Sequence, residues 1–233
     1  MLERLVLWDI DGTLIRAGEV AKDVFALAVE HAVGSHPGEH GVIMGGKTDP
    51  QIALEILAGM GIDAREGEDH LPLVMERMEA ELAAAVELIR ERGRVLPGAA
   101  EVLAALDADP RVAQTVLTGN TAVNAATKLA AFDLERWLDV EIGAFGSDDR
   151  DRPALVPVAL RRAAEQRGWA GTPEDVWVVG DTPNDLACAR AGGVRCALVG
   201  TGHTPVEELH ALGADAVLDD LCDVDAVVKL LMS

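Results

Sequence analysis

The stretch LVLWDIDGT at positions 5–13 begins with four consecutive apolar residues and continues with two aspartates. Four apolar residues in a row are typical of a strand that is buried on both faces of a sheet. We expect that strand to end at Asp9, and side-chain alternation then places Asp9 and Asp11 on the same side of the departing chain. Gly12 permits a tight turn that would aim both carboxylates into a cleft. The alternative is an Asx-type turn that serves only the backbone.

Similar apolar runs recur in the second half of the chain, each closed by Gly, Thr or Asp and separated by helical patterns. Strands that alternate with helices predict an α/β fold, namely a doubly wound, mostly parallel sheet with helices on both faces. Catalytic groups in such a sheet gather at the carboxyl ends of the strands. The expected strands are 5–8, 112–117, 176–179, 196–199 and 216–218, and the expected helices are 99–106, 122–131, 154–167, 184–191 and 224–231.

Residues 17–93 break this alternation, because helical patterns rich in Ala, Leu, Glu and Met follow one another with no strand between them. We therefore predict an all-helical cap domain of residues 17–93. It is inserted into an α/β core domain made of residues 1–16 and 94–233, to which two short hinges join it. The expected cap helices are 20–33, 50–60 and 71–92.

The charge of the chain restricts its partners. Asp and Glu number 40 against 20 Lys and Arg, which gives a formal net charge of −20. Such a surface repels phosphate backbones and anionic lipids, so we expect no nucleic-acid or membrane partner. A small anionic substrate stays possible where a metal ion or a few cations invert the local field. No apolar run approaches the ~20 residues that span a bilayer, which predicts a soluble, cytoplasmic protein.

Polar residues also follow the predicted strand 112–117. Thr118, Gly119 and Asn120 stand at the start of the next expected helix. A hydroxyl beside a glycine amide at a helix start suits a phosphate oxygen. An ordinary helix N-cap is the alternative interpretation of the same residues.

A third strand end carries two more acids. Asp181 closes the predicted strand 176–179, and Asp185 lies in the first turn of the helix after it. Together with Asp9 and Asp11 they would form an oxygen-rich cluster, and hard oxygen ligands suit Mg²⁺. Alternatively, both acids serve only as caps and dipole partners of the helix start.

The patterns DxDGT at 9–13, TGN at 118–120 and GDxxxD at 180–185, in this order, resemble those of the haloacid dehalogenase-like (HAD) hydrolase superfamily. The helical insertion after the first motif is similar to the subgroup that includes phosphoglycolate phosphatases and β-phosphoglucomutases. The resemblance covers nearly the whole chain. The acidic residue at position 11 makes the chain similar to the phosphatases and phosphomutases, since the dehalogenases and the phosphonate-cleaving members lack an acid two positions after the nucleophile.

The resemblance implies a role for each motif residue. Asp9 would be the nucleophile that carries an aspartyl-phosphate. Asp11 would protonate the leaving oxygen and then activate water. Thr118 and the amide of Gly119, with Asn120 beside them, would bind the phosphoryl group.

The resemblance also implies a Mg²⁺ cofactor. Asp181 would bind the ion alongside the Asp9 carboxylate and the backbone carbonyl of Asp11. Asp185 would orient a water bound to the metal. A cation of this kind would neutralise the charges that otherwise keep a phosphate dianion away from a carboxylate nucleophile.

The chain lacks one positively charged residue that the family usually has. The superfamily usually has a Lys between the second and third motifs that screens the nucleophile and binds the phosphate, and the stretch 147–153 has none. Arg152, directly before Pro153, is best placed to replace it, with Lys128 or Lys47 as the next candidates. The alternative is that Arg152 only offsets the surrounding acids on the surface. Its planar fork also differs in reach from an ammonium group.

The segment MGGKTD at 44–49 resembles the cap loop that closes over the cleft in this subgroup. Lys47 would then touch the leaving group of the substrate. In the alternative interpretation, Thr48 or Asp49 caps the helix that follows.

Taken together, the residues and the resemblance imply a Mg²⁺-dependent phosphatase that acts on a small phosphorylated metabolite. The first alternative is a phosphomutase, which hands the phosphoryl group to a second hydroxyl and yields a phosphosugar isomer. The second is a catalytically weak HAD-like protein that acts through protein contacts, whose expected signature is the loss of Asp9 or Asp181. Both acids are present. Substrate identity and oligomeric state stay open.

Overall fold

A six-stranded parallel sheet in the order β5-β4-β1-β6-β7-β8 forms the centre of the protein. The computed structural model describes residues 2–233. Because β1 lies between β4 and β6, the chain winds first to one side and then to the other, which confirms the predicted doubly wound fold. The strands are β1 (Arg4–Trp8), β4 (Val112–Thr118), β5 (Ala144–Phe145), β6 (Val176–Gly180), β7 (Arg195–Val199) and β8 (Ala216–Leu218).

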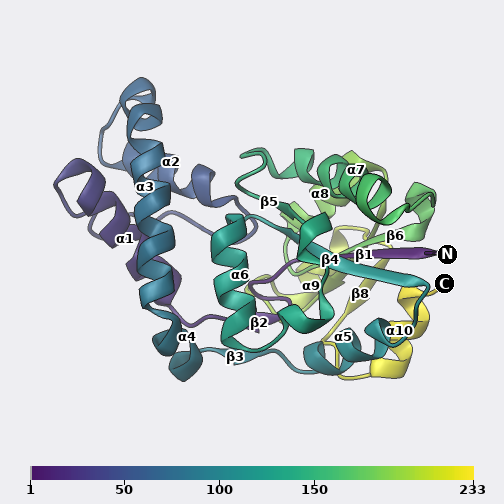
Figure 1. The fold of residues 1–233 in the computed structure, drawn as a ribbon. Helices are drawn as coiled ribbons and strands as arrows, with labels where there is room; N and C mark the ends of the chain where they lie inside the picture. The colour runs from purple at the N-terminus through teal and green to yellow at the C-terminus, as the bar shows by residue number, and fades with distance from the viewer. Residues whose placement is uncertain (1) are drawn as a thin grey trace.

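Helices cover both faces of this sheet (Figure 1). Leu5 and Leu7 of β1 belong to a core that includes residues of α7 and α8, whereas Val6 and Trp8 belong to a core that includes residues of α5, α6 and α10. All four side chains are buried, and each contributes about 1.5–3 kcal/mol to the folded state. The helices are α5 (Ala99–Asp107), α6 (Ala122–Ala131), α7 (Leu155–Arg167), α8 (Pro183–Gly192), α9 (Val206–Ala211) and α10 (Val224–Leu231).

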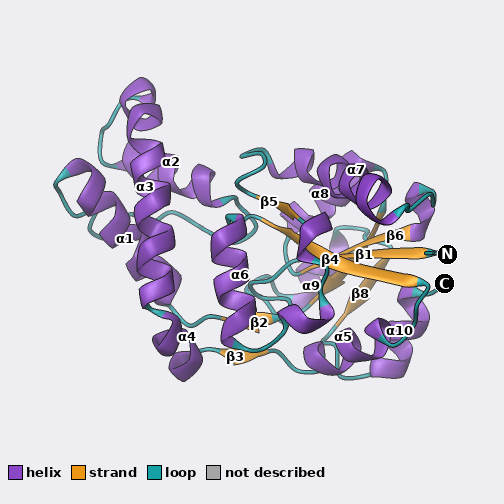
Figure 2. Ribbon diagram, in the orientation of Figure 1, coloured by secondary structure: helices purple, strands orange, loops and turns teal. Residues whose placement is uncertain are grey.

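Four more helices gather at one end of the molecule, on the left in Figures 1 and 2. They are α1 (Val20–Val33), α2 (Asp49–Gly59), α3 (Ala64–Ala84) and α4 (Val86–Arg92), and no strand lies within 17–93. A short antiparallel ribbon of β2 (Ile15–Arg16) and β3 (Arg94–Val95) brackets this segment. That residues 17–93 form a domain of their own stays a prediction.

The predicted helix 71–92 is wrong, because two helices occupy this part of the chain. The first begins at Ala64, where Asp63 Oδ1 accepts hydrogen bonds from the backbone amides of Arg65 (2.9 Å) and Glu66 (3.0 Å). It ends before Ala85, whose φ of −90° and ψ of 7° interrupt the helical conformation.

The strands β2, β3 and β5 and four short 3₁₀ helices were not expected either, since two or three residues carry no recognisable pattern. The 3₁₀ helices are Glu135–Trp137, Val140–Ile142, Arg152–Ala154 and Pro173–Asp175. None of the helices described between residues 2 and 233 has the length and apolar composition needed to cross a bilayer.

Candidate active site

Three polar residues stand at the carboxyl ends of the three central strands. Asp9 follows β1, Thr118 ends β4, and Asp181 follows β6. The parallel register pairs Trp8 of β1 with Val116 of β4 and also with Val179 of β6. The three strand ends therefore meet at one edge of the sheet, at the point where the winding changes direction, which is where such sheets bind their ligands.

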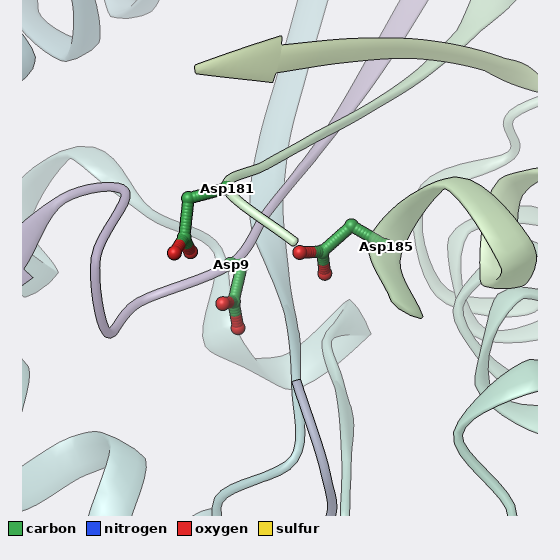
Figure 3. A group of neighbouring side chains, drawn as sticks. All are labelled: Asp9, Asp181 and Asp185. Carbon is green, nitrogen blue, oxygen red and sulfur yellow. The ribbon is translucent and has the colours of Figure 1, made fainter. Parts of the chain in front are cut away.

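The carboxylates of Asp9, Asp181 and Asp185 form a buried cluster at this edge (Figure 3). One oxygen of each lies within 4.8 Å of the others. Burial raises the pKa of Asp181 to about 8, and the neighbouring charges of Asp185 and Asp9 add to the shift. Burial likewise raises the pKa of Asp9 to about 6, against the opposing effect of Arg152. The cluster thus concentrates negative charge that a cation would relieve.

Asp181 has the strongest need for such a cation. Its Oδ1 accepts a hydrogen bond from the Thr13 hydroxyl at 3.2 Å. Within residues 2–233, no Lys, Arg or His forms an ion pair with it. A buried carboxylate without a positive partner is costly. Its environment and its hard oxygen atoms fit a divalent ion such as Mg²⁺.

The loop after β1 reaches Asp181 because it contains a glycine. Gly12 has a φ of 89°, a conformation that side chains with a Cβ rarely adopt. A Cβ built at Gly12 would lie 2.5 Å from Asp181 Oδ2. The same small residue therefore supplies both the turn and the space for the acid.

Asp185 is more fully engaged than the other two acids. Its Oδ2 accepts hydrogen bonds from the backbone amide of Thr182 at 3.0 Å and from the Thr182 hydroxyl at 2.6 Å. This is the capping box of α8, so the predicted capping alternative is present as well. The Oδ1 atom accepts from Arg152 Nη2. Because both oxygens have partners, Asp9 and Asp181 are freer than Asp185 to bind a metal directly.

The structure brings Arg152 to the nucleophile candidate. Its side chain is 5% exposed, and Nη2 lies 3.0 Å from Asp9 Oδ1 while it also contacts Asp185. Burial opposes the positive charge, but the Asp185 and Asp9 carboxylates outweigh burial and raise the pKa of the guanidinium. The alternative of a surface residue among acids is wrong. Arg150, two residues earlier, is exposed and pairs with Glu68 of α3.

The predicted cluster of four acids is wrong for the side chain of Asp11, because its carboxylate is held in a second polar group by Asn120 and Lys128. Its Oδ2 accepts from Asn120 Nδ2 at 2.9 Å and from Lys128 Nζ at 2.6 Å. The same Asn120 nitrogen donates to the Thr118 hydroxyl oxygen at 2.8 Å. Thr118 and Asn120, which were both expected at the phosphate, thus contact each other. Asn120 also holds Asp11, the expected general acid.

Lys128 was predicted only as a reserve cation, and its contact with Asp11 was not expected from the sequence. Lys128 is 4% exposed and lies on the inner side of α6 with Ala125 and Leu129. A lysine on an otherwise apolar helix face is the one signal that could have identified it, because lysine is almost never buried without a partner.

The cap loop lies directly on the second motif. The Asp49 amide donates to the Gly119 carbonyl oxygen at 2.8 Å, and a Cβ at Gly119 would lie 2.0 Å from the Lys47 carbonyl oxygen. The Lys47 ammonium pairs with Glu55 Oε2 of α2 at 2.5 Å. The expected contact of Lys47 with a leaving group stays a prediction.

Of the two capping candidates, Thr48 is the N-cap of α2, since its hydroxyl accepts from the Gln51 amide at 3.3 Å. Asp49 has a different role, which the sequence did not reveal. Its buried Oδ2 accepts from the Thr121 amide at 2.9 Å and from Asn124 Nδ2 at 3.0 Å. These bonds join the N-terminus of α2 to α6.

Comparison with known proteins adds the family. A model of the haloacid dehalogenase-like hydrolase family matches residues 6–190. The chain belongs to this family. This HAD hydrolase is 31% identical to phosphoglycolate phosphatase from Cereibacter sphaeroides over 230 residues, which cover 94% of the chain and 96% of the relative. It is 29% identical to phosphoglycolate phosphatase from Caulobacter vibrioides over 234 residues, or 98% and 92% of the two chains.

The fold of the HAD hydrolase is also that of solved relatives. The structure of CbbY from Rhodobacter sphaeroides in complex with phosphate superposes on this chain with a TM-score of 0.67 and 20% sequence identity. The superposition covers 96% of each of the two chains. The match of the family model to residues 6–190 confirms the family resemblance that the three motifs predicted.

Proposed function

We propose that this HAD hydrolase is a Mg²⁺-dependent phosphatase that cleaves a small phosphate monoester through an aspartyl-phosphate on Asp9. The observation that carries the proposal is the buried group of Asp9, Asp181 and Arg152 at the switch point of the sheet. The names of two relatives, both phosphoglycolate phosphatases, support a small anionic monoester such as phosphoglycolate as substrate.

We assign the cofactor to the oxygen atoms of the cluster. Asp9 and Asp181 would hold Mg²⁺ with the backbone carbonyl of Asp11, and Asp185 would orient a water on the ion. When bound, Mg²⁺ supplies the positive charge that lets a phosphate dianion approach a carboxylate. Asp181 has no ion-pair partner among residues 2–233, which supports this assignment.

The first half-reaction uses Asp9 as nucleophile. One Asp9 oxygen forms a bond to phosphorus as the bond from phosphorus to the leaving oxygen breaks, and Asp11 transfers a proton to that oxygen. The Thr118 hydroxyl oxygen already accepts from Asn120, so its own proton is free to bind a phosphoryl oxygen together with the Gly119 amide. Arg152 compensates negative charge beside Asp9.

The second half-reaction restores the enzyme. Asp11, now ionised, takes a proton from a water whose oxygen attacks the phosphorus. The bond between phosphorus and the Asp9 oxygen breaks, and inorganic phosphate leaves. Asp9 is then ionised and Asp11 protonated again, as at the start.

We propose in addition that residues 17–93 act as the cap domain over a core of residues 1–16 and 94–233. The bonds from Asp49 to Thr121 and Asn124 support a closed arrangement in which α2 lies against the site. A closed cap excludes bulk water, which strengthens the electrostatic contacts inside. It also favours small leaving groups.

A panel of phosphorylated metabolites tests the proposal. The wild-type enzyme in Mg²⁺ is expected to release inorganic phosphate from phosphoglycolate with a higher kcat/KM than from sugar phosphates or nucleotides. The panel is repeated with Asp9→Asn to measure the background of contaminating phosphatases. Failure to release phosphate from every monoester, or formation of an isomeric phosphosugar in place of free phosphate, contradicts the proposal.

A further inference from the structure

Two buried cations flank the site, and the proposed mechanism uses only one of them. Arg152 contacts Asp9 and Asp185. Lys128 contacts Asp11, with Nζ at 2.6 Å from Oδ2 and a side chain only 5% exposed. The Asp11 side chain is 41% exposed, so it is open on one side while Lys128 holds it from the protein interior.

The contacts restrain one oxygen of Asp11. Lys128 Nζ and Asn120 Nδ2 both donate to Oδ2, and Lys128 Nζ also donates to Asn120 Oδ1 at 2.7 Å. These three bonds close a triangle that defines the orientation of the carboxyl group. Across the described residues, no hydrogen bond of the protein engages Oδ1. That oxygen is therefore the one available for proton transfer.

Packing alone does not explain a lysine at this position. Its helix neighbours Ala125 and Leu129 are apolar and buried, so an apolar side chain would suit the same face of α6. Burying an ammonium group costs free energy unless it is paired and hydrogen-bonded. Among residues 2–233, Asp11 is the one acid that forms an ion pair with Lys128. Asp49 makes no ion pair with the lysine, although the charge of Lys128 opposes the rise in the pKa of Asp49 that burial causes. The lysine thus acts on Asp11.

We propose that Lys128 is a positioning residue for the proton-transfer step. It holds Asp11 through Oδ2 so that the other oxygen delivers its proton to the leaving group, a role that rests on the proposed function. The consequence depends on the substrate. An alkoxide leaving group needs that proton to depart, whereas p-nitrophenolate is a weak base that leaves without it.

The test compares two substrates in Lys128→Met, whose side chain has similar length and no charge. The values of kcat/KM are measured in saturating Mg²⁺ for p-nitrophenyl phosphate and for the best alkyl phosphate of the panel. This ratio reports the steps up to departure of the leaving group, and it excludes the later hydrolysis of the aspartyl-phosphate. We expect kcat/KM for the alkyl ester to fall about 100-fold, and the fall for p-nitrophenyl phosphate to be at least about tenfold smaller.

Further variants separate positioning from folding. Lys128→Arg keeps the charge and the donors and is expected to recover part of the alkyl-phosphate activity. Lys229→Met removes an exposed lysine from α10 and serves as the matched control. Should Lys128→Met fail to show a cooperative melting transition, Lys128→Leu, which is apolar like its neighbours Ala125 and Leu129 and has no N–H donor, provides the same comparison.

Three results are decisive. Equal losses for both substrates, or no loss for either, overturn the role of Lys128. A selective loss for the alkyl ester supports it. A wild-type enzyme that releases phosphate from neither substrate contradicts the proposed function itself, so the two failures are distinguishable.

Discussion

Replacement of Arg152 by Ala removes the one cation that forms an ion pair with Asp9 or Asp185 in the part of the chain that the structure describes. Both acids are buried, so water replaces the lost partner poorly. Removing one partner of a buried pair costs about 3–5 kcal/mol of folding free energy. For a protein of this size, that corresponds to a melting temperature about 6–20 °C lower.

Turnover is expected to fall as well. The guanidinium lies 3.0 Å from Oδ1 of Asp9. In the proposed mechanism this carboxylate attacks phosphorus, so charge would shift beside Arg152 as the new bond forms. Loss of one preorganised donor at such a position lowers kcat on the order of 100-fold or more. Because the contact strengthens in the transition state, kcat is expected to change more than KM. Arg152→Lys keeps the charge but loses the two-pronged geometry, so it is expected to recover part of the rate.

The assay is phosphate release in saturating Mg²⁺, with thermal unfolding of each variant measured in parallel. Arg150→Ala is the matched control, since Arg150 is exposed and its guanidinium pairs with Glu68 instead of with the acidic cluster, and it is expected to change little. Wild-type kcat in a folded Arg152→Ala enzyme would show that Arg152 does not assist the reaction at Asp9. A crippled Arg150→Ala beside an active Arg152→Ala would show that the assignment is wrong by two residues.

Three further predictions follow from the cluster. Asp9→Asn keeps the shape of the side chain without its attacking charge, so the folded variant is expected to lose nearly all turnover in a phosphate-release assay; substantial turnover would argue against a covalent mechanism. Chelation is expected to abolish activity and lower the melting temperature, Mg²⁺ to restore both, and Ca²⁺ to restore stability with poor turnover; full activity in excess chelator would exclude a metal role. Because burial raises the pKa of Asp181 from 3.8 to about 8, the folded chain binds a proton that the unfolded chain has released, and this contribution to stability is lost as the pH rises toward 8. The melting temperature of metal-free Asp181→Asn, relative to that of wild type, should therefore rise as the pH increases from about 5 to 8. A difference in melting temperature that stays constant across that range would contradict the raised pKa of Asp181.

The sheet and its acidic edge could be predicted because the information is local. Strands such as β1 and β6 are continuous apolar runs, and Asp9 and Asp181 follow them directly. Parallel strands then bring residues that are far apart in sequence to one edge. The position of Arg152 was predicted on a different ground, from the family resemblance, because it stands directly before Pro153 where the superfamily usually has a lysine.

Other contacts could not be predicted, since they depend on how separate elements pack. Lys128 and Asp11 are 117 positions apart, and only the placement of α6 against the loop after β1 brings them together. Asp49 stands at a helix start, where an acid normally signals nothing beyond a favourable helix dipole. Its bonds to Thr121 and Asn124 exist because α2 meets α6. Two-residue strands such as β2 are too short for any periodicity.

The most direct test of the mechanism is to trap the phosphoryl group. Wild-type enzyme is quenched in acid during turnover in Mg²⁺, digested at low pH, and examined by mass spectrometry. We expect the mass of one phosphoryl group on the peptide that contains Asp9, with its fragmentation assigned to that residue and the label lost after hydroxylamine treatment. Phosphate release without a phosphorylated Asp9, or a label on another residue, would show that Asp9 is not the nucleophile.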